Sequence, residues 1–237
     1  MLSVIMPLYN EEDTLAEVVR QVLRAPCELE KELIVVNDCS TDASGQVAEQ
    51  LAKKDGRIRV FHHHRNRGKG AAIRTAIAQI RGEYAIIQDA DLEYDPREYS
   101  ILLEPLLSGR ADVVFGSRFC VRYDRHKYTP QRTTGLSSSL LGNRMVTCFS
   151  NLLSGLRLTD METCFKLIPT EVLRQLKLRS GRFGIEPELT ARLAKLKLRI
   201  CEVPISYLPR QYSHGKKINW KDGLAALWHI IRFNLLD

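Results

Sequence analysis

Two aspartates separated by one residue, Asp89 and Asp91, are the part of the sequence that points most directly to chemistry. They follow the apolar segment 84–88, which is typical of a buried strand. Side chains two residues apart in an extended segment point the same way, so both carboxylates can bind one cation. Hard oxygen ligands suit Mg²⁺ or Mn²⁺, ions that also bind substrate phosphates. A solvated acidic turn is the alternative interpretation.

Polar residues also follow the other apolar segments in the first half of the chain. Asn, Asp, Ser and Gly are common in loops, but repeated clusters at strand ends indicate one shared crevice. Asp38 could accept hydrogen bonds from a nucleobase or a ribose, or it could cap the helix that follows. The adjacent histidines at 62–64 predict a poor metal site, because neighbouring strand residues face opposite sides. The polar clusters are 7–11, 37–42, 65–70, 89–93 and 116–118.

The elements that position these clusters alternate between strands and helices. Apolar residues at helical spacing follow each predicted strand, and Asn10 is the predicted cap of the first helix. Such alternation predicts βαβ units, a parallel sheet and right-handed crossovers. The predicted strands of the first half are 2–6, 33–36, 58–61, 84–88 and 112–115. The second half predicts helices over 136–153, 186–196 and 219–236, and strands over 163–168 and 199–203.

Composition limits the class of protein. The 237 residues, with 44% hydrophobic and 27% charged, predict a globular chain of one or two domains. The net charge of +7 suggests an anionic partner, but no nucleic-acid-binding motif is present, so we expect no nucleic acid partner. The six scattered cysteines are typical of reduced thiols. With no signal-peptide pattern and no long apolar stretch, the sequence predicts a cytoplasmic location.

An ordered set of motifs resembles glycosyltransferase family 2. The nearest resemblance is to the polyprenol-phosphate hexosyltransferases, such as dolichyl-phosphate mannose synthase. It extends over nearly the whole chain, and the set as a whole is far more specific than any one motif. The motifs are PLYNEE at 7–12, VVNDCSTD at 35–42, RNRGKGAA at 65–72, QDADLEYDP at 88–96, ADVVFGSRF at 111–119, TDMETCFK at 159–166, RFGIEPEL at 182–189, EVPISY at 202–207 and GKK at 215–217.

The resemblance implies a GT-A fold, with a Rossmann-like, mostly parallel sheet flanked by helices. It implies a single catalytic domain over 1–212, followed by a loop and an amphipathic helix over 213–237. The family usually has Asp-Asp-Gly-Ser where this chain has Asn37, Asp38, Cys39 and Ser40. Cysteine in place of glycine predicts that this turn does not need a positive φ.

The resemblance also implies the roles of particular residues. Asp89 and Asp91 would hold Mg²⁺ or Mn²⁺, with Glu93 as a third ligand. Arg118 and Arg144 would hold the phosphate of the acceptor. Residues implied in nucleotide binding are Pro7, Tyr9, Glu11, Asp38, Lys69 and Asp89, with Arg210 and Lys216 on a loop that closes over the donor diphosphate.

The predicted reaction is metal-dependent, inverting transfer of a hexose from a nucleotide sugar of the GDP-mannose or UDP-glucose type to a polyprenyl or dolichyl phosphate. A phosphate acceptor is already anionic at neutral pH, so it needs positioning rather than deprotonation. One alternative is a soluble or polymeric hydroxyl acceptor, for which Asp160 is the candidate base unless it caps the preceding helix. Another alternative is an inactive nucleotide-sugar-binding homologue.

The last predicted helix has one apolar face and nearby basic residues. Trp220, Leu224, Leu227, Trp228, Ile231 and Leu235 share that face at helical spacing. Such a helix is typical of a segment that lies on an anionic membrane. We therefore expect residues 218–236 to contact a membrane or a membrane protein, peripherally and on the cytoplasmic side. The alternative is that the helix packs on its own domain or on a partner subunit.

Overall fold

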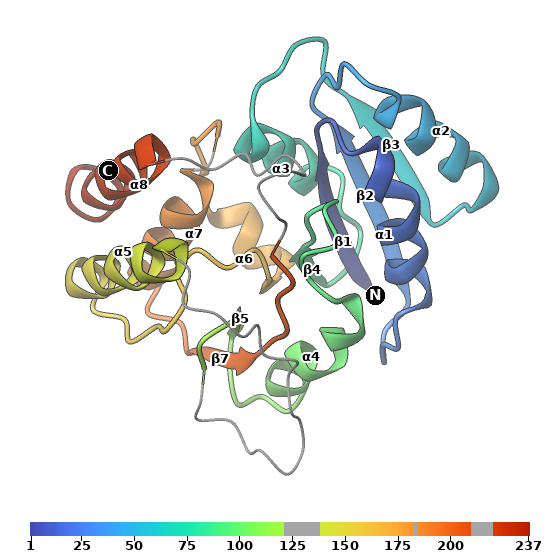
Figure 1. Cartoon of the computed structure of the whole chain (residues 1–237). Helices are drawn as coiled ribbons and strands as arrows, with labels where there is room; N and C mark the ends of the chain where they lie inside the picture. Colours follow the sequence, from blue (N-terminus) through green and yellow to red (C-terminus); the bar gives the residue numbers. More distant parts are fainter. Residues whose placement is uncertain (121–137, 183, 210–219) are drawn as a thin grey trace.

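The computed structural model describes residues 1–120, 138–182, 184–209 and 220–237 (Figure 1). Its centre is a seven-stranded sheet with the order β3-β2-β1-β4-β6-β5-β7. Strand β6 runs antiparallel to β4 and β5, and the other pairings are parallel. The strands are β1 Leu2–Leu8, β2 Lys31–Asn37, β3 Ile58–His62, β4 Tyr84–Ile87, β5 Val113–Ser117, β6 Lys166–Pro169 and β7 Ile200–Pro204.

Helices cover the sheet and form a separate group beyond it. Helix α3 packs against β1 and β2, while α5, α7 and α8 pack on one another on the left of Figure 1. The helices are α1 Glu12–Arg24, α2 Ser44–Lys54, α3 Lys69–Ile77, α4 Tyr99–Leu107, α5 Ser138–Ser154, α6 Thr170–Gln175, α7 Ile185–Lys195 and α8 Trp220–Ile231, with a 3₁₀ turn η1 Pro96–Glu98 and a π-helical segment η3 Arg232–Leu236.

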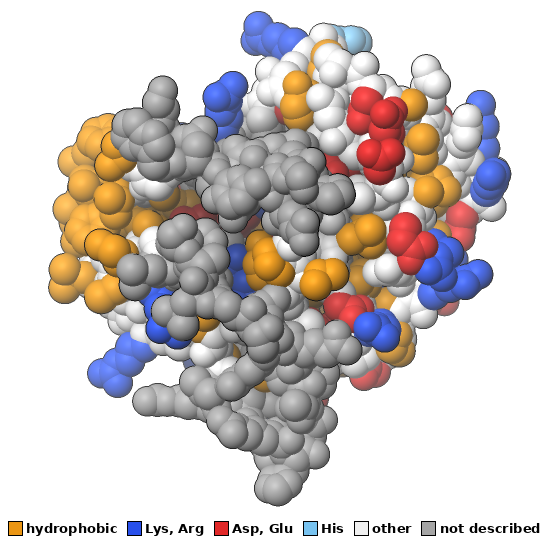
Figure 2. All heavy atoms as spheres, viewed as in Figure 1, with side chains coloured by type: hydrophobic (Ala, Val, Ile, Leu, Met, Phe, Trp, Pro, Cys, Tyr) orange, Lys and Arg blue, Asp and Glu red, His pale blue; other side chains and the backbone are white. Residues whose placement is uncertain are grey.

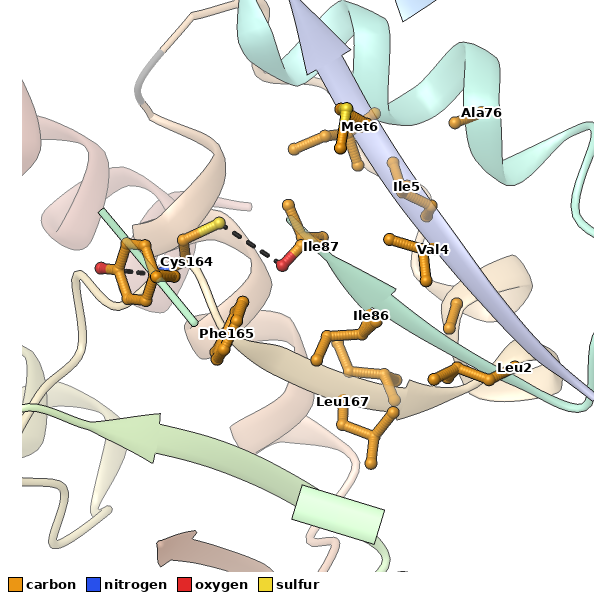
Figure 3. Close-up of a cluster of buried hydrophobic side chains, with 14 of the residues drawn as sticks. Leu2, Val4, Ile5, Met6, Ala76, Ile86, Ile87, Cys164, Phe165 and Leu167 are labelled. Atoms are coloured by element: carbon orange, nitrogen blue, oxygen red, sulfur yellow. Dashed lines mark hydrogen bonds between the residues drawn. The ribbon is translucent and has the colours of Figure 1, made fainter. Parts of the chain in front are cut away.

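The core is continuous across the sheet (Figure 3). Strands β1 and β2 are buried on both faces over most of their length, which explains their unbroken apolar sequences. Just before β6, Phe165 is fully buried and the Cys164 thiol donates a 3.4 Å hydrogen bond to the Ile87 carbonyl oxygen. This contact fixes the chain before β6 against the end of β4, immediately before the two aspartates.

The predicted mostly parallel sheet flanked by helices is confirmed, with two local corrections. Asn10 does not cap the first helix, because it has a φ of 53° and Glu11 is the N-cap residue. Its side-chain oxygen instead accepts a 2.8 Å hydrogen bond from the backbone N–H of Thr41. Cys39 has a φ of 62°, so the prediction that this turn needs no positive φ is wrong. Cysteine occupies the left-handed conformation that glycine adopts more easily.

The second half differs from its predicted bounds at several points. Strand β6 begins at Lys166 rather than at 163, and α8 is described from Trp220 onward. The predicted division between 212 and 213 lies outside the described residues. Helix α8 packs against α5 and α7, and its buried residues are not the predicted apolar face. Ile230 and Phe233 are buried, whereas Leu224, Trp228 and Leu235 are more than half exposed. In the described ranges, no helix has the length and apolar character needed to cross a membrane.

Candidate active site

The predicted polar clusters gather beyond the carboxyl ends of the parallel strands. Asp89 and Asp91 follow β4, and Lys69, the first residue of α3, contacts Asp89. The Lys69 Nζ lies 2.9 Å from an Asp89 carboxylate oxygen and 3.1 Å from a Glu186 oxygen. Burial alone would lower the pKa of Lys69, but nearby negative charges, Asp89 foremost, hold that pKa well above its usual range. Lys69 is therefore a fixed cation beside the first aspartate.

The loop that carries Lys69 needs glycine on both sides of it. Gly68 has a φ of 85°, and a side chain at Gly68 or Gly70 would collide with backbone atoms of residues 180–182. The loop and the 180–182 segment are therefore in direct backbone contact, which Ala71 extends by donating a 3.1 Å hydrogen bond to the Gly181 carbonyl oxygen. This close approach explains the RGKG sequence better than a phosphate-binding spacing does.

Asp38 anchors the same loop from the end of β2. Its carboxylate accepts hydrogen bonds from the backbone N–H of Arg67 at 2.9 Å and of Gly68 at 2.6 Å, and it lies 2.6 Å from His63 Nδ1. Asp38 is only 2% exposed. These contacts make Asp38 an organiser of the 65–70 loop. Asp38 does not cap α2, whose N-cap residue is Ala43, and the carboxylate of Asp42 accepts a 2.9 Å bond from the N–H of Ser44, the first residue of that helix.

The end of β1 lies beside the two aspartates. Thr14, in the first turn of α1, donates a 2.7 Å hydrogen bond to the carbonyl oxygen of Ala90, between Asp89 and Asp91. Pro7 and Glu11 are partly exposed and Tyr9 is 36% exposed, so their side chains are accessible at this edge. The backbone N–H of Glu11 donates to Ser44 Oγ at 2.7 Å, which holds the loop after β1 against α2.

Glu93 is hydrogen-bonded to Tyr207, which is not among the predicted site residues. The Tyr207 hydroxyl donates a 2.8 Å hydrogen bond to Glu93 Oε2, and the backbone N–H of Leu208 donates to the Glu93 carbonyl oxygen at 2.9 Å. Asp91 accepts a 3.1 Å bond from the Glu93 backbone N–H, in a turn where Leu92 has a φ of 61°. The segment after β7 is thus tied to the loop that carries the aspartates.

Arg118 forms a buried ion pair with Asp160. Its Nε and Nη2 atoms donate to the two Asp160 oxygens at 2.6 and 2.7 Å, and its backbone N–H donates at 3.1 Å. Asn143 of α5 donates a further 2.8 Å bond to this carboxylate, which is fully buried. Burial would raise the pKa of Asp160, but the charge of Arg118 outweighs it and the pKa is lowered. A paired carboxylate of low pKa is poorly suited to act as a general base.

Arg118 and Arg144 lie against the same aromatic ring. Their Cζ atoms are 5.8 Å and 5.3 Å from the ring centroid of Phe119, and Arg144 is exposed on α5. The Arg118 guanidinium also lies 4.9 Å from the ring centroid of Tyr207. The two arginines that the resemblance selected are therefore brought together, although they are far apart in sequence. Arg210 and Lys216 lie outside the described residues.

Two buried groups extend this network beyond the predicted residues. Glu186 of α7 bridges two lysines, because its second oxygen lies 2.9 Å from the Nζ of the fully buried Lys166. Glu98 is 3% exposed and accepts a 2.8 Å hydrogen bond from the backbone N–H of Ser206. Burial raises the pKa of Glu98 to about 7. Glu186 stands in the RFGIEPEL motif, whereas Glu98 follows the QDADLEYDP motif by two residues, and nothing local in the sequence indicates the partners of either.

The predicted metal ligands Asp89, Asp91 and Glu93 are only partly suited to hold a divalent cation. In the portion of the chain that the structure describes, no three His, Cys, Asp or Glu side chains are grouped so as to hold a metal. Lys69 already neutralises Asp89, and Tyr207 binds Glu93. Mg²⁺ often binds through only one or two carboxylates, with substrate phosphates and water completing its shell. Asp91, a partly exposed residue, has the donor chemistry that such a ligand would need.

The fold and this site define a GT-A glycosyltransferase. The model of the family described as Glycosyl transferase family 2 matches residues 3–176, and the chain belongs to that family. The fold is similar to glucosyl-3-phosphoglycerate synthase from Mycobacterium tuberculosis, solved with Mn²⁺, UDP and phosphoglyceric acid. The TM-score is 0.72 at 19% identity, over 100% of this chain and 79% of that chain.

Curated relatives also cover most of the chain. It is 29% identical to undecaprenyl-phosphate mannosyltransferase of Micrococcus luteus, over 98% of this chain and 97% of that protein. It is 31% identical to the glycosyltransferase AglD of Haloferax volcanii over 88% of this chain, which spans 33% of AglD. A third relative is the undecaprenyl-phosphate 4-deoxy-4-formamido-L-arabinose transferase of Edwardsiella ictaluri, at 27% identity over 91% of this chain and 62% of that protein.

Proposed function

We propose that this family 2 enzyme transfers a hexose from a nucleotide-sugar donor, of the GDP-mannose or UDP-glucose type, to a polyprenyl phosphate with inversion. The observation that carries the proposal is the pair of arginines against Phe119, next to the loop of the two aspartates. Planar guanidinium groups suit a phosphate oxyanion. Relatives named for undecaprenyl-phosphate acceptors support the same acceptor class.

The ion pair of Asp160 with Arg118, together with the lowered pKa of Asp160, favours a phosphate acceptor over a hydroxyl acceptor. A hydroxyl nucleophile requires a base to take its proton, whereas a phosphate monoester is largely dianionic at neutral pH. Asp160 is the predicted base, yet both of its oxygens are bound to Arg118 and its pKa is lowered. In this proposal, Asp160 fixes the Arg118 guanidinium so that its outward side can bind the acceptor phosphate.

The proposed binding site for the nucleotide-sugar donor is built from the loops that follow the strands. Lys69 and the Asp38-anchored loop form one wall of the nucleotide pocket, and Pro7, Tyr9 and Glu11 form the other. Asp91 is the proposed ligand of Mg²⁺ or Mn²⁺, with Asp89 and Glu93 beside it. A bound ion would neutralise charge on the departing nucleoside diphosphate. Arg210 and Lys216 remain proposed ligands of that diphosphate.

A transfer assay tests the proposal directly. Purified protein is incubated with a short polyprenyl phosphate, Mg²⁺ or Mn²⁺, and labelled GDP-mannose or UDP-glucose, and the product is extracted into organic solvent. We expect ion-dependent label in the organic phase, lost in Asp91→Ala and Arg118→Ala but retained in Arg97→Ala, a control at a surface arginine whose side chain is 75% exposed. The anomeric configuration of the product tests inversion.

Other outcomes of this assay would reassign the function. Hydrolysis or binding of a donor without lipid labelling would overturn the acceptor assignment and favour a hydroxyl acceptor. If no donor bound at all, the chain would be an inactive homologue.

A further inference from the structure

The hydrogen-bonding capacity of the Asp38 carboxylate is almost fully used inside the protein. A carboxylate has about four acceptor positions, two on each oxygen. On Oδ1, His63 Nδ1 takes one position at 2.6 Å and the backbone N–H of Arg67 takes the other at 2.9 Å. On Oδ2, the backbone N–H of Gly68 takes one position at 2.6 Å. Asp38 can therefore accept one further hydrogen bond, through Oδ2, and its 4% exposed side chain agrees with a single contact.

The order of the strands places Asp38 at some distance from the aspartates proposed to lie beside the diphosphate. Asp89 and Asp91 follow β4, Asp38 follows β2, and β1 lies between these two strands. Neighbouring strands are about 4.8 Å apart, so the ends of β2 and β4 are separated by roughly 10 Å. On the other side of β4, β6 runs antiparallel, so its carboxyl end lies at the opposite edge of the sheet. A donor whose diphosphate lies beside the aspartates therefore extends its nucleobase toward Asp38.

The loop between β3 and α3 surrounds this position with hydrogen-bond donors. Arg65 and Arg67 are exposed on this loop, and residues 61–82 contain no aspartate or glutamate. Figure 2 shows basic and histidine side chains at the top of the view, over the position of the loop in Figure 1. Both ends of the neighbouring Asn37 amide are bound by protein groups. A base at this position meets several donors and the one open acceptor position of Asp38.

Nucleobases differ in the order of donors and acceptors along the edge that such a site would contact. Uracil has a single donor, N3–H, between the acceptors O2 and O4. Guanine has the acceptor O6 followed by two adjacent donors, N1–H and the 2-amino group. A carboxylate binds both guanine donors only when each of its oxygens has an open position, and Oδ1 of Asp38 has none. Guanine would therefore keep one buried donor without an acceptor, which weakens binding.

We propose that the donor of this enzyme is a uridine nucleotide sugar, and that Asp38 recognises the base by accepting one hydrogen bond from uracil N3–H. His63 is a positioning residue, because its contact with Oδ1 closes that oxygen to a second donor of the base. The uridine assignment rests on the proposed function, within which it selects the UDP-sugar class over the GDP-sugar class.

Isothermal titration calorimetry of the full chain with nucleoside diphosphates and Mg²⁺ tests the assignment, because these ligands share the diphosphate and differ in the base. UDP should bind at least about tenfold more tightly than GDP, and than CDP, whose N3 carries no hydrogen. N3-methyl-UDP lacks only the N3–H donor of UDP and should also bind at least about tenfold more weakly. IDP lacks only the 2-amino group of GDP and should bind more tightly than GDP.

The variant Asp38→Asn provides a second readout. The asparagine oxygen has two acceptor positions, both needed by His63 and the Arg67 N–H, and the asparagine nitrogen has none. The dissociation constant of N3-methyl-UDP divided by that of UDP should therefore fall from at least about ten to near one. The control Asp42→Asn makes the same change at a carboxylate that accepts from the Ser44 N–H, and should keep the wild-type ratio.

This ratio separates recognition of the base from a purely structural role of Asp38 in the loop, because a uniform loss of affinity does not alter it. If Asp38→Asn did not fold, the comparison of nucleotides on the wild type would decide alone. GDP binding as tightly as UDP, GDP binding more tightly than IDP, or an unchanged ratio in Asp38→Asn would each overturn the assignment. The base would then be recognised by another acceptor, such as Glu11.

Two further outcomes separate this inference from the proposed function. If no nucleotide bound, the proposed function would fail and the uridine assignment would fail with it. If UDP bound with the expected selectivity but no UDP-sugar gave a labelled lipid product, the polyprenyl-phosphate acceptor would be wrong and the uridine assignment would stand.

Discussion

The buried carboxyl group of Glu98 should make the stability of the enzyme depend on pH above pH 5. Glu98 is 3% exposed under the segment that follows β7, and desolvation outweighs the hydrogen bonds from Ser206. Its pKa is raised from 4.5 to about 7. Because the folded-state pKa is raised, the protonated form stabilises the fold. That stability is fully present below pH 4.5 and is lost as the pH rises through 7.

The size of this effect follows from the two pKa values. One pKa unit corresponds to about 1.4 kcal/mol, so ionising Glu98 should reduce the free energy of unfolding by about 2–3 kcal/mol between pH 5 and pH 8. Glu98→Gln keeps the shape and an oxygen that can accept the Ser206 N–H, but it cannot ionise. The variant should therefore become more stable than the wild type as the pH rises, by about that amount.

Urea unfolding at several pH values between 5 and 8 measures the effect. The informative quantity is the difference between variant and wild type at each pH, because titration of the histidines then cancels. Glu83→Gln, at an exposed position before β4, is the control for the same chemical change. If the Glu98→Gln difference were the same at pH 5 and pH 8, Glu98 would not be protonated in the fold and the reasoning would be refuted.

Three further predictions concern the active site. Tyr207→Phe removes the hydrogen bond to Glu93 but keeps the ring against Arg118, and should lower kcat/KM about tenfold without altering the unfolding midpoint; an unchanged kcat/KM would make this bond incidental. Arg118→Ala should abolish transfer to lipid phosphate while calorimetry still detects donor binding, and loss of donor binding would contradict an acceptor role. Asp160→Asn should lower the free energy of unfolding, measured with urea, by about 3 kcal/mol, because it leaves the buried Arg118 charge without its partner. A change under about 1 kcal/mol, the size found for exposed ion pairs, would show that solvent compensates the Arg118 charge.

The local pattern of the sequence was sufficient for much of the first half. Buried strands with unbroken apolar sequences and helices with regular apolar spacing follow from backbone geometry that neighbouring residues set. Prediction failed where a distant contact decided the local conformation. Cys39 adopts a positive φ in a turn where its thiol faces the His64 carbonyl oxygen, at 3.8 Å, and Asn37 accepts from Ser40. The preference of glycine over cysteine for a positive φ is an average over many proteins and takes no account of such contacts. It therefore gave the wrong prediction for this turn.

Helix α8 shows the same division between pattern and packing. Its apolar spacing predicted an amphipathic helix, but spacing alone does not say which side finds a partner. Packing on α5 and α7 buries Ile230 and Phe233 and leaves Leu224 and Trp228 exposed. Which apolar residues of α8 stay exposed therefore becomes visible only when the helices are assembled.

The sequence by itself determined the family, the order of the elements and most of the residues that gather at the strand ends. Only the tertiary structure decided their pairing: Lys69 with Asp89 and Glu186, Arg118 with Asp160, and Tyr207 with Glu93. Local periodicity fixes backbone conformation within a few residues. The partner of a buried charge depends on which segments the whole sheet brings together, and these partners are separated by 20 to 117 positions along the chain.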